Sequence, residues 1–299
     1  MRTRVGVTVL SFDAVMREVT RGGALELSAF DYSRFARRAV ERGFDHLELT
    51  LDMRYVLPGS FDRDSVKALK AIGEEHNVTF SAHLPLWSVE PASHICGIRQ
   101  ASVNALVESV RDLEELRPDP YVLHATGSLA AEFHRLQIEP SYKRLITGIF
   151  LENARDSVGQ LVEQMADIGI ASRRIALESV EFPFLETLRL AEEFETSVCI
   201  DTGHILAGYP GDVDLGKALR ASRGRVAEIH LHDAYRRVSG DCVKVRDHLP
   251  LGTGDLDVEG LLDLLDEIGF DGPIVFELSL EDASRSLKLL QGREKQQNL

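Results

Sequence analysis

Short apolar runs alternate with amphipathic segments along the whole chain. Strand-like runs lie near residues 4–12, 46–52, 79–85, 121–127, 174–181, 197–203, 226–233 and 273–279. Between them, apolar residues recur at three- and four-residue steps with charges on the other face, as is typical of helices, at 31–43, 62–76, 99–116, 184–195 and 258–269. Asp31 and Asp257 stand where helix N-caps are expected, and Gly43 where the first helix should end. Eight strands, each followed by helical material, predict a single (β/α)8 TIM barrel, an α/β fold over residues 1–299.

The longest interval between predicted strands, roughly 128–172, holds a helix-like stretch and is expected to form a lid or rim segment. A doubly wound open sheet is the competing architecture. It would need a Gly-rich phosphate turn after its first strand, where the chain reads VLSFDAVM. The barrel is therefore the better prediction, and without a Pro/Gly linker in the sequence one domain is expected.

Residues that can bind metals or transfer protons end most of the apolar runs. A buried strand has little use for a carboxylate or an imidazole unless something pairs with it. Six of the ten histidines lie in these segments, which indicates convergence on one centre at the carboxyl ends of the strands. The runs are TFSAHLP (His83), YVLHATG (His124), IALESVE (Glu178), VCIDTGH (Asp201, His204), AEIHLHDA (His230, His232, Asp233), PIVFELS (Glu277) and VRDHLPLGTG (His248), the last read as a loop after a strand.

Histidine and carboxylate donors without cysteine suit Zn²⁺, Mn²⁺, Mg²⁺, Fe²⁺ or Co²⁺ rather than a thiolate-rich structural zinc site. Taken singly, each of these residues could be a hydrogen-bonded rim residue, but their concentration indicates metal binding. His46 and Glu48, on the second predicted strand, leave two interpretations open: a polar network in the core or a pocket wall.

Charge and composition narrow the classes of function. The net charge of −14 argues against a broad nucleic-acid footprint, which rests on clustered Lys and Arg. The sequence has no apolar run long enough to cross a membrane and opens on a strand-like RVGVTVLSF rather than a signal peptide. Three cysteines (Cys96, Cys199 and Cys242) show no metal-type pairing, so a cytoplasmic protein with reduced thiols is expected.

A basic stretch follows the seventh predicted strand in this otherwise acidic chain. Arg236, Arg237, Lys244 and Arg246 form either a solvated loop or, beside a metal centre, a phosphate clamp. Trp87, the only tryptophan, is either a platform for a substrate ring or a packing residue.

The set of motifs resembles the xylose isomerase-like barrel superfamily, which contains endonuclease IV-type phosphodiesterases and sugar or sugar-phosphate isomerases and epimerases. The resemblance covers nearly the whole chain. It rests on Glu178, the DTGH at 201–204, the HLHD at 230–233, the HxxLGxG turn at 248–254 and Glu277. The resemblance implies that Glu178, Asp201, His230 and Glu277 form the single-metal site shared by the isomerases and epimerases.

Endonuclease IV-like members add histidines for further ions. By resemblance, His83 and His124 would hold a second ion with Glu178 as the bridge, while His204 and His248 match two of three ligands of a third. The missing third ligand is an Asp whose place is taken by Arg246, so two divalent ions (Zn, Mn, Fe or Co) are expected.

Two hypotheses for function follow. The first is metal-dependent hydrolysis of a phosphodiester in a small or nucleotide-like molecule, a cobamide among them, rather than in DNA. In it Glu178 and Glu277 are catalytic: Glu178 bridges the ions and Glu277 orients or deprotonates the attacking water. His204 and His248, with Arg246, would hold the phosphate oxygens.

The expected partner of the chain is a small phosphorylated substrate, contacted by Arg246, His232 and Trp87, and a homodimer is the expected assembly. The second hypothesis is isomerisation or 3-epimerisation of a sugar or sugar phosphate with one divalent ion, with Glu178 and Glu277 moving the proton. The surplus histidines favour hydrolysis.

Overall fold

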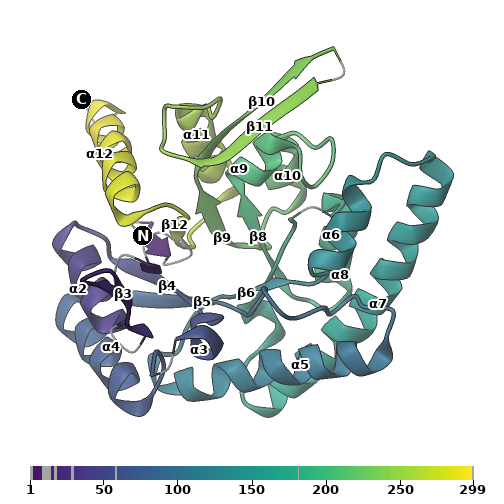
Figure 1. Ribbon diagram of the computed structural model, residues 1–299. Coiled ribbons are helices and arrows are strands. Elements are labelled where there is room, and N and C mark those ends of the chain that lie inside the picture. The colour runs from purple at the N-terminus through teal and green to yellow at the C-terminus, as the bar shows by residue number, and fades with distance from the viewer. Residues whose placement is uncertain are drawn as a thin grey trace.

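Eight apolar runs of the chain pair side by side as parallel strands and close into a barrel in the computed structural model (Figure 1). The structure describes residues 3–8, 15–16, 19–27, 30–57, 59–180, 182–240 and 242–297. The order around the barrel is β1-β12-β9-β8-β7-β6-β5-β4, and β4 pairs with β1 to close it. The barrel strands are β1 (Val5–Thr8), β4 (His46–Thr50), β5 (Thr79–His83), β6 (Tyr121–His124), β7 (Ile175–Glu178), β8 (Ser197–Asp201), β9 (Val226–Leu231) and β12 (Ile274–Phe276).

The predicted (β/α)8 barrel is thus confirmed, with one strand for each predicted run. Residues 9–12 of the first predicted strand lie outside the described residues. Successive side chains of a strand point to opposite faces. In β4, Leu47 and Leu49 pack in the main hydrophobic core, while His46 and Glu48 point into the barrel, where they meet polar partners.

Helices surround the barrel, and the caps follow the sequence pattern. Asp31 accepts a hydrogen bond from the backbone N–H of Ser33, and Asp257 accepts one from that of Gly260, as N-caps do. The helices are α2 (Tyr32–Glu41), α3 (Met53–Val56), α4 (Arg63–His76), α5 (Cys96–Val110), α6 (Ser128–Arg135), α7 (Pro140–Asp167), α8 (Phe184–Glu193), α9 (Thr202–Ala207), α10 (Leu215–Ala221), α11 (Val258–Ile268) and α12 (Leu280–Gln297), with 3-10 turns η2 (Arg111–Leu116) and η3 (Ser172–Arg174).

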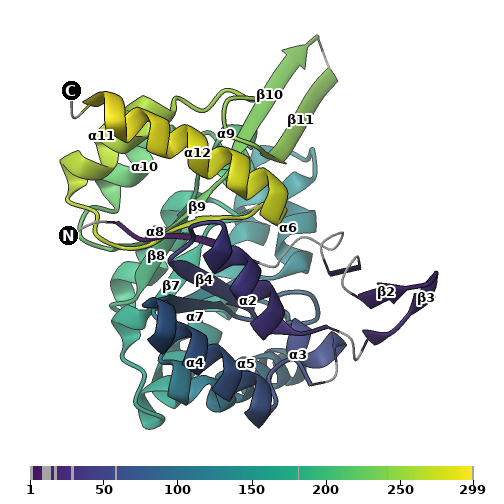
Figure 2. The ribbon, with the colours of Figure 1, turned by 90° about the vertical axis from the view of Figure 1, so that its left-hand side faces the viewer.

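The stretch 128–172 is mainly the long helix α7, and the expectation of a lid is wrong for this helix. Phe150, Ala154, Val158 and Leu161 are buried on one face of α7, which packs against α5 in the outer helical layer. The short helix α6, which begins at Ser128, starts just past β6 at the rim of the barrel. Two small elements were not predicted: the hairpin of β2 (Thr20–Arg21) and β3 (Ala24–Leu25), which stands away from the helical layer in Figure 2.

A second hairpin corrects the loop expected around VRDHLPLGTG. β10 (Asp233–Ser239) and β11 (Cys242–Leu249) form an antiparallel ribbon that crosses α9 and extends away from the barrel (Figure 1). Its cross-strand pairs include Val238 with Val243 and Arg237 with Lys244. The exposed charges of this ribbon look like a loop in the sequence, although their alternation with Val243 and Val245 is the two-residue period of a strand.

Asp233, at the base of the hairpin, holds the glycine-rich turn that follows it. The Asp233 carboxylate accepts hydrogen bonds from the backbone N–H groups of Ala234, Gly252, Thr253, Gly254 and Leu256, at 2.8–3.0 Å. A Cβ at Gly254 would collide with Asp233 and with the Ala234 carbonyl, so this position requires glycine. A fully buried carboxylate of the chain itself therefore occupies the N–H groups with which such a turn could bind an external anion.

Within the described part of the chain, no helix is both long and apolar enough to span a membrane. The cytoplasmic location and the homodimer stay predictions.

Replacing Asp233 with Asn should destabilise the protein strongly. The amide NH2 group would face backbone N–H donors, and the negative charge that strengthens these hydrogen bonds would be lost. We expect the free energy of unfolding to fall by about 3 kcal/mol, in the range of a lost buried charged hydrogen bond. Urea unfolding followed by circular dichroism measures this. Asp257→Asn is the matched control: Asn caps helices as well as Asp, so its effect should stay below about 0.5 kcal/mol. Equal stability of the two variants would contradict the role given to Asp233.

Candidate metal centre

Three carboxylates surround one ring nitrogen of His230, and all four residues lie at the ends of barrel strands. The Nδ1 atom of His230 lies 3.2 Å from Glu277 Oε1, 3.5 Å from Glu178 Oε2 and 4.0 Å from Asp201 Oδ2. Glu178 and Asp201 are the last residues of β7 and β8, His230 is near the end of β9, and Glu277 follows β12. Because the strands are parallel, their carboxyl ends share one rim, and the four side chains converge there.

Two polar atoms of this group lack hydrogen-bond partners. His230 Nδ1 and Glu178 Oε1 are buried and unpaired among the described residues. Leaving a buried polar atom unpaired costs about 1–3 kcal/mol. Oxygen and imidazole ligands lie about 2.0–2.2 Å from a zinc-sized ion, so donors 3–4 Å apart can share one. The donor set therefore fits a divalent cation.

A second group lies beside the first and shares Glu178. Glu178 Oε2 is 3.0 Å from His124 Nε2 and 3.4 Å from His83 Nε2, and the two imidazole rings meet edge to face at 4.9 Å. These three residues, predicted from the sequence as one ligand set, are close enough to hold one ion together.

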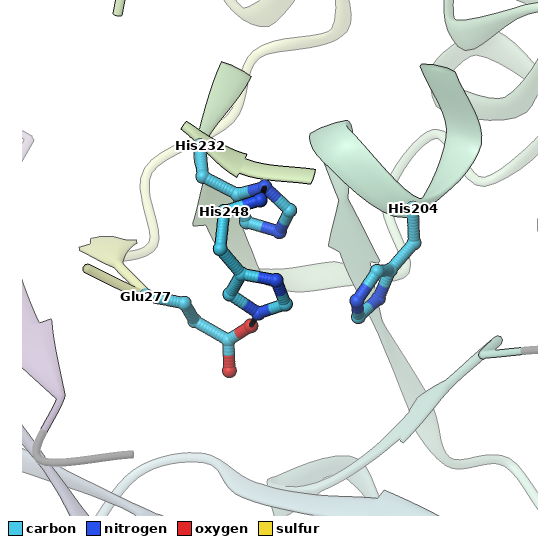
Figure 3. A group of neighbouring side chains, drawn as sticks. All are labelled: His204, His232, His248 and Glu277. Atoms are coloured by element: carbon cyan, nitrogen blue, oxygen red, sulfur yellow. Dashed lines mark hydrogen bonds and ion pairs between the residues drawn. The ribbon is translucent and has the colours of Figure 1, made fainter. Parts of the chain in front are cut away.

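A third group contains His204, His232, His248 and Glu277, which Figure 3 shows in detail. The rings of His232 and His248 lie one over the other, with centroids 4.2 Å apart, and His204 approaches from α9 on the other side. His248 Nε2 lies 3.5 Å from Glu277 Oε2. His204 Nδ1 also comes within 3.4 Å of Glu178 Oε1, which links the third group to the first.

His232 is fully buried and contacts Asp201. Its Nδ1 atom accepts a hydrogen bond from the backbone N–H of His248 at 2.9 Å, so its hydrogen is on Nε2, which donates to Asp201 Oδ2 at 3.0 Å. A Cβ at Gly203 would collide with the ring, so only glycine fits there. His232 thus has both nitrogens engaged within the protein, and its expected contact with substrate stays a prediction.

The centre concentrates ionised carboxylates. Burial raises the pKa of Glu178, but its histidine neighbours, His230 and His124, outweigh burial and hold it well below the usual range. Burial lowers the pKa of His204, but the carboxylates of Asp201 and Glu178 outweigh burial and raise it to about 9. Protons on the histidines thus compensate the carboxylates, and a divalent cation would displace such protons on binding.

Below the strand ends, a polar network crosses the barrel interior. His230 Nε2 lies 3.0 Å from Glu48 Oε2 and 3.3 Å from Glu228 Oε1. Burial raises the pKa of Glu48, but His230 outweighs it and lowers the value to about 2. Burial, helped by Glu48, raises the pKa of Glu228 well above its ordinary range, so Glu48 is the anion of the pair and Glu228 the neutral acid.

The alternatives left open for His46 and Glu48 are therefore decided in favour of a core polar network. Sequence reasoning missed Glu228 and the position of Cys199, a buried thiol within ligand distance of Glu178 and His230. The sequence pattern could have identified Glu228: residues 228 and 230 are two positions apart on one strand, so their side chains share a face.

The other residues predicted to contact the substrate are exposed, outside the buried donor groups. Trp87 is 42% exposed and donates its backbone N–H to Asp52. Arg246 is exposed on β11, opposite Tyr235. The guanidinium of Arg237 pairs with Asp255 and lies over the Tyr235 ring, so it is already engaged. Substrate binding by Trp87 and Arg246 stays a prediction.

Comparison with known proteins gives one family and a consistent set of neighbours. The model of the xylose isomerase-like TIM barrel family matches residues 36–294. A ketose 3-epimerase of Arthrobacter globiformis is 26% identical over 267 residues, 85% of this chain and 79% of the relative. An uncharacterized protein of Methanocaldococcus jannaschii is 23% identical over 265 residues, 85% of this chain and 81% of the relative.

Among solved structures, a D-tagatose 3-epimerase-like protein superimposes with a TM-score of 0.70 at 19% identity, covering 99% of this chain and 98% of the other. The 3-keto-D-glucoside 4-epimerase of E. coli gives 0.68 at 15% identity, covering 97% of this chain and all of the other (100%). At these identities the structures establish the shared fold.

Replacing Glu178 with Gln should abolish tight binding of a divalent ion, because Glu178 contributes to the first two donor groups and lies against the third. We expect dialysed wild-type protein to retain metal and to gain thermal stability with added Mn²⁺, and Glu178→Gln to do neither. Elemental analysis and thermal melts measure both. His76→Ala, on the outside of α4, is the control and should match wild type. Equal metal content in Glu178→Gln and wild type would contradict the assignment.

Proposed function

The chain belongs to the xylose isomerase-like TIM barrel family, and on that premise we propose that it is a divalent-metal-dependent sugar epimerase or isomerase, with 3-epimerisation of a ketose as the reaction. The observation that carries the proposal is the pair of carboxylates, Glu178 and Glu277, that approach Nδ1 of His230 from different strands at 3.5 and 3.2 Å.

Glu178, Asp201, His230 and Glu277 would hold the ion. A divalent cation bound there polarises the carbonyl and hydroxyl oxygens of a ketose, which makes the hydrogen on C3 more acidic. These residues are almost fully buried, so their charges act in a medium that screens them weakly.

Epimerisation at C3 requires a proton to leave one face of the sugar and another to arrive on the opposite face. Glu178 would accept the C3 proton, leaving an enediolate, and Glu277 would deliver a proton to the other face; the reverse reaction exchanges the roles. Two strands, β8 and β9, separate β7 from β12 in the barrel, which supports placement of the two carboxylates on different sides of a bound sugar.

The surplus imidazoles have a role in this chemistry. His83, His124, His204 and His248 surround the centre and can exchange hydrogen bonds with sugar hydroxyls. The substrate is either a free sugar or a sugar phosphate. Asp233 already occupies the N–H groups of the turn at 252–254, so a phosphate group would depend on exposed side chains such as Arg246.

Phosphodiester hydrolysis, favoured at first by the histidines, is the second candidate. It is supported by the geometry of His83, His124 and Glu178, which could hold a second ion. The similar proteins reported above whose names give an activity are epimerases of sugars, and this favours the epimerase. The number of ions separates the two. If the protein holds two ions per chain and His124→Ala loses one, hydrolysis is supported; one ion in both proteins supports the epimerase.

Incubation with a ketose in deuterated water should yield the 3-epimer with deuterium at C3, because the proton returns from a group that exchanges with solvent. D-tagatose, D-psicose and L-ribulose, free and phosphorylated, form the panel, with NMR as readout. Glu178→Gln and Glu277→Gln should each lower kcat by roughly 10²–10⁴-fold, the usual contribution of a general acid or base.

Deuterium at C2 of an aldose product would identify an aldose–ketose isomerase instead. Glu267→Gln, on the exposed side of α11 and paired with Arg220, is the control and should keep activity within a few-fold. Turnover of bis-p-nitrophenyl phosphate without any change in the sugars would refute the epimerase.

A further inference from the structure

Part of the barrel interior is polar, although such interiors are usually filled by branched apolar side chains. His46, Glu48, Ser81, Glu228 and His230 are at most 1% exposed. They come from β4, β5 and β9, and β9 is adjacent to neither of the other two strands. Their contacts therefore cross the interior of the barrel. Burying this many polar groups is unfavourable unless each is paired in a defined arrangement.

The hydrogens of this network have a consistent direction. His46 Nδ1 lies 2.8 Å from Thr79 Oγ1 and its Nε2 3.0 Å from Ser81 Oγ. Ser81 Oγ in turn donates to Glu228 Oε1 at 3.2 Å. A neutral His46 that accepts from Thr79 and donates to Ser81 fits all three contacts, and burial lowers the pKa of His46 to about 3, which keeps it neutral. Ser81 then donates its hydrogen to Glu228, which links Glu228 to His46 through Ser81.

His230 meets this network with one nitrogen only. Its Nε2 atom faces Glu48 Oε2 at 3.0 Å, while its Nδ1 atom faces the rim carboxylates and has no hydrogen-bond partner. A neutral imidazole carries one hydrogen. In the metal-binding form that hydrogen is on Nε2, because Glu48 Oε2 lies within hydrogen-bond distance of it, and the lone pair of Nδ1 points to the place where Glu178 and Glu277 meet.

Resting on the metal site of the proposed function, we propose that Glu48 is a positioning residue: its carboxylate fixes the Nε2–H tautomer and the orientation of His230, so that Nδ1 is the atom that binds the ion. Glu228, which accepts a hydrogen bond from Ser81, lies 3.3 Å from the same Nε2 atom on the side of Ser81 and His46. Partners of this kind behind a ligating histidine typically change metal affinity by roughly 10–100-fold when removed.

The first test is the affinity for Mn²⁺, measured by calorimetry on chelator-treated protein. Glu48→Leu removes the acceptor and should raise the Kd by roughly 10–100-fold. Glu48→Gln keeps the shape and one acceptor oxygen but not the charge, and should fall between Glu48→Leu and wild type. Ser81→Ala is the matched control, since Ser81 lies in the same network but contacts Glu228 and His46 rather than His230. It should lower the melting temperature and leave the Kd within about threefold of wild type, because it leaves the partner of His230 in place.

The second test reads the tautomer directly, with ¹⁵N-labelled histidine and diamagnetic Zn²⁺. In wild type we expect a His230 hydrogen on Nε2, shifted downfield by Glu48 and protected from exchange, with zinc on Nδ1; the signal is assigned by its absence in His230→Gln. In Glu48→Gln the His230 Nε2–H signal should move upfield, and this hydrogen should exchange faster with solvent. Zinc on Nε2 in wild type, or a Kd in both Glu48 variants equal to that of wild type, would overturn the proposal.

Failure of the proposed function gives a different result. If wild type binds neither Mn²⁺ nor Zn²⁺, the metal site itself is wrong. The Nε2–H signal of His230, recorded without metal, then still tests the Glu48 contact through its change in Glu48→Gln. If Glu48→Leu does not fold, Glu48→Gln and the wild-type spectrum decide the matter.

Discussion

The imidazole of His230 is the contact on which the rest of the site depends. One of its nitrogens faces Glu178, Asp201 and Glu277 at the rim of the barrel, and the other faces Glu48 inside it. A ring that is fully buried and flanked by carboxylates on both sides has few alternative orientations. All three rim carboxylates lie within about 4 Å of the same ring nitrogen, so the orientation of this ring determines how they are grouped.

The barrel tolerates this charge because its interior is divided. Val122, Ala176 and Cys199 form a small apolar cluster on the side of β6, β7 and β8. The polar network crosses the interior between β4 and β5 and the distant strand β9. The side chains at the rim thus lie above both packed apolar side chains and directed hydrogen bonds, and both restrict their motion.

Asp233 is a second kind of buried carboxylate at the same rim, and it stabilises a turn of the chain. Asp233 gathers five backbone N–H groups and so fixes the turn between the hairpin and α11. This turn follows directly on His248, whose ring lies over His232. Two adjacent residues of one motif, His232 and Asp233, therefore serve different purposes: His232 holds Asp201, and Asp233 holds the loop that carries His248.

The sequence by itself determined the barrel, because short apolar runs and the helical period between them are local patterns. It also determined that His83, His124, Glu178, Asp201, His230 and Glu277 end strands, and parallel strands bring such ends to one rim. It read the basic stretch 236–246 and the run 245–254 as loops, although β10 and β11 cover much of them, since the exposed charges of a two-stranded ribbon resemble those of a loop. The tertiary structure decided which inward residues meet across the barrel: Glu228 and Glu48 lie 180 positions apart, and only the closure of β1 on β4 and β12 sets which side chains of opposite strands face each other. For the same reason the tautomers of His230 and His232, which depend on partners distant in the chain, could not be read from the motif that contains them.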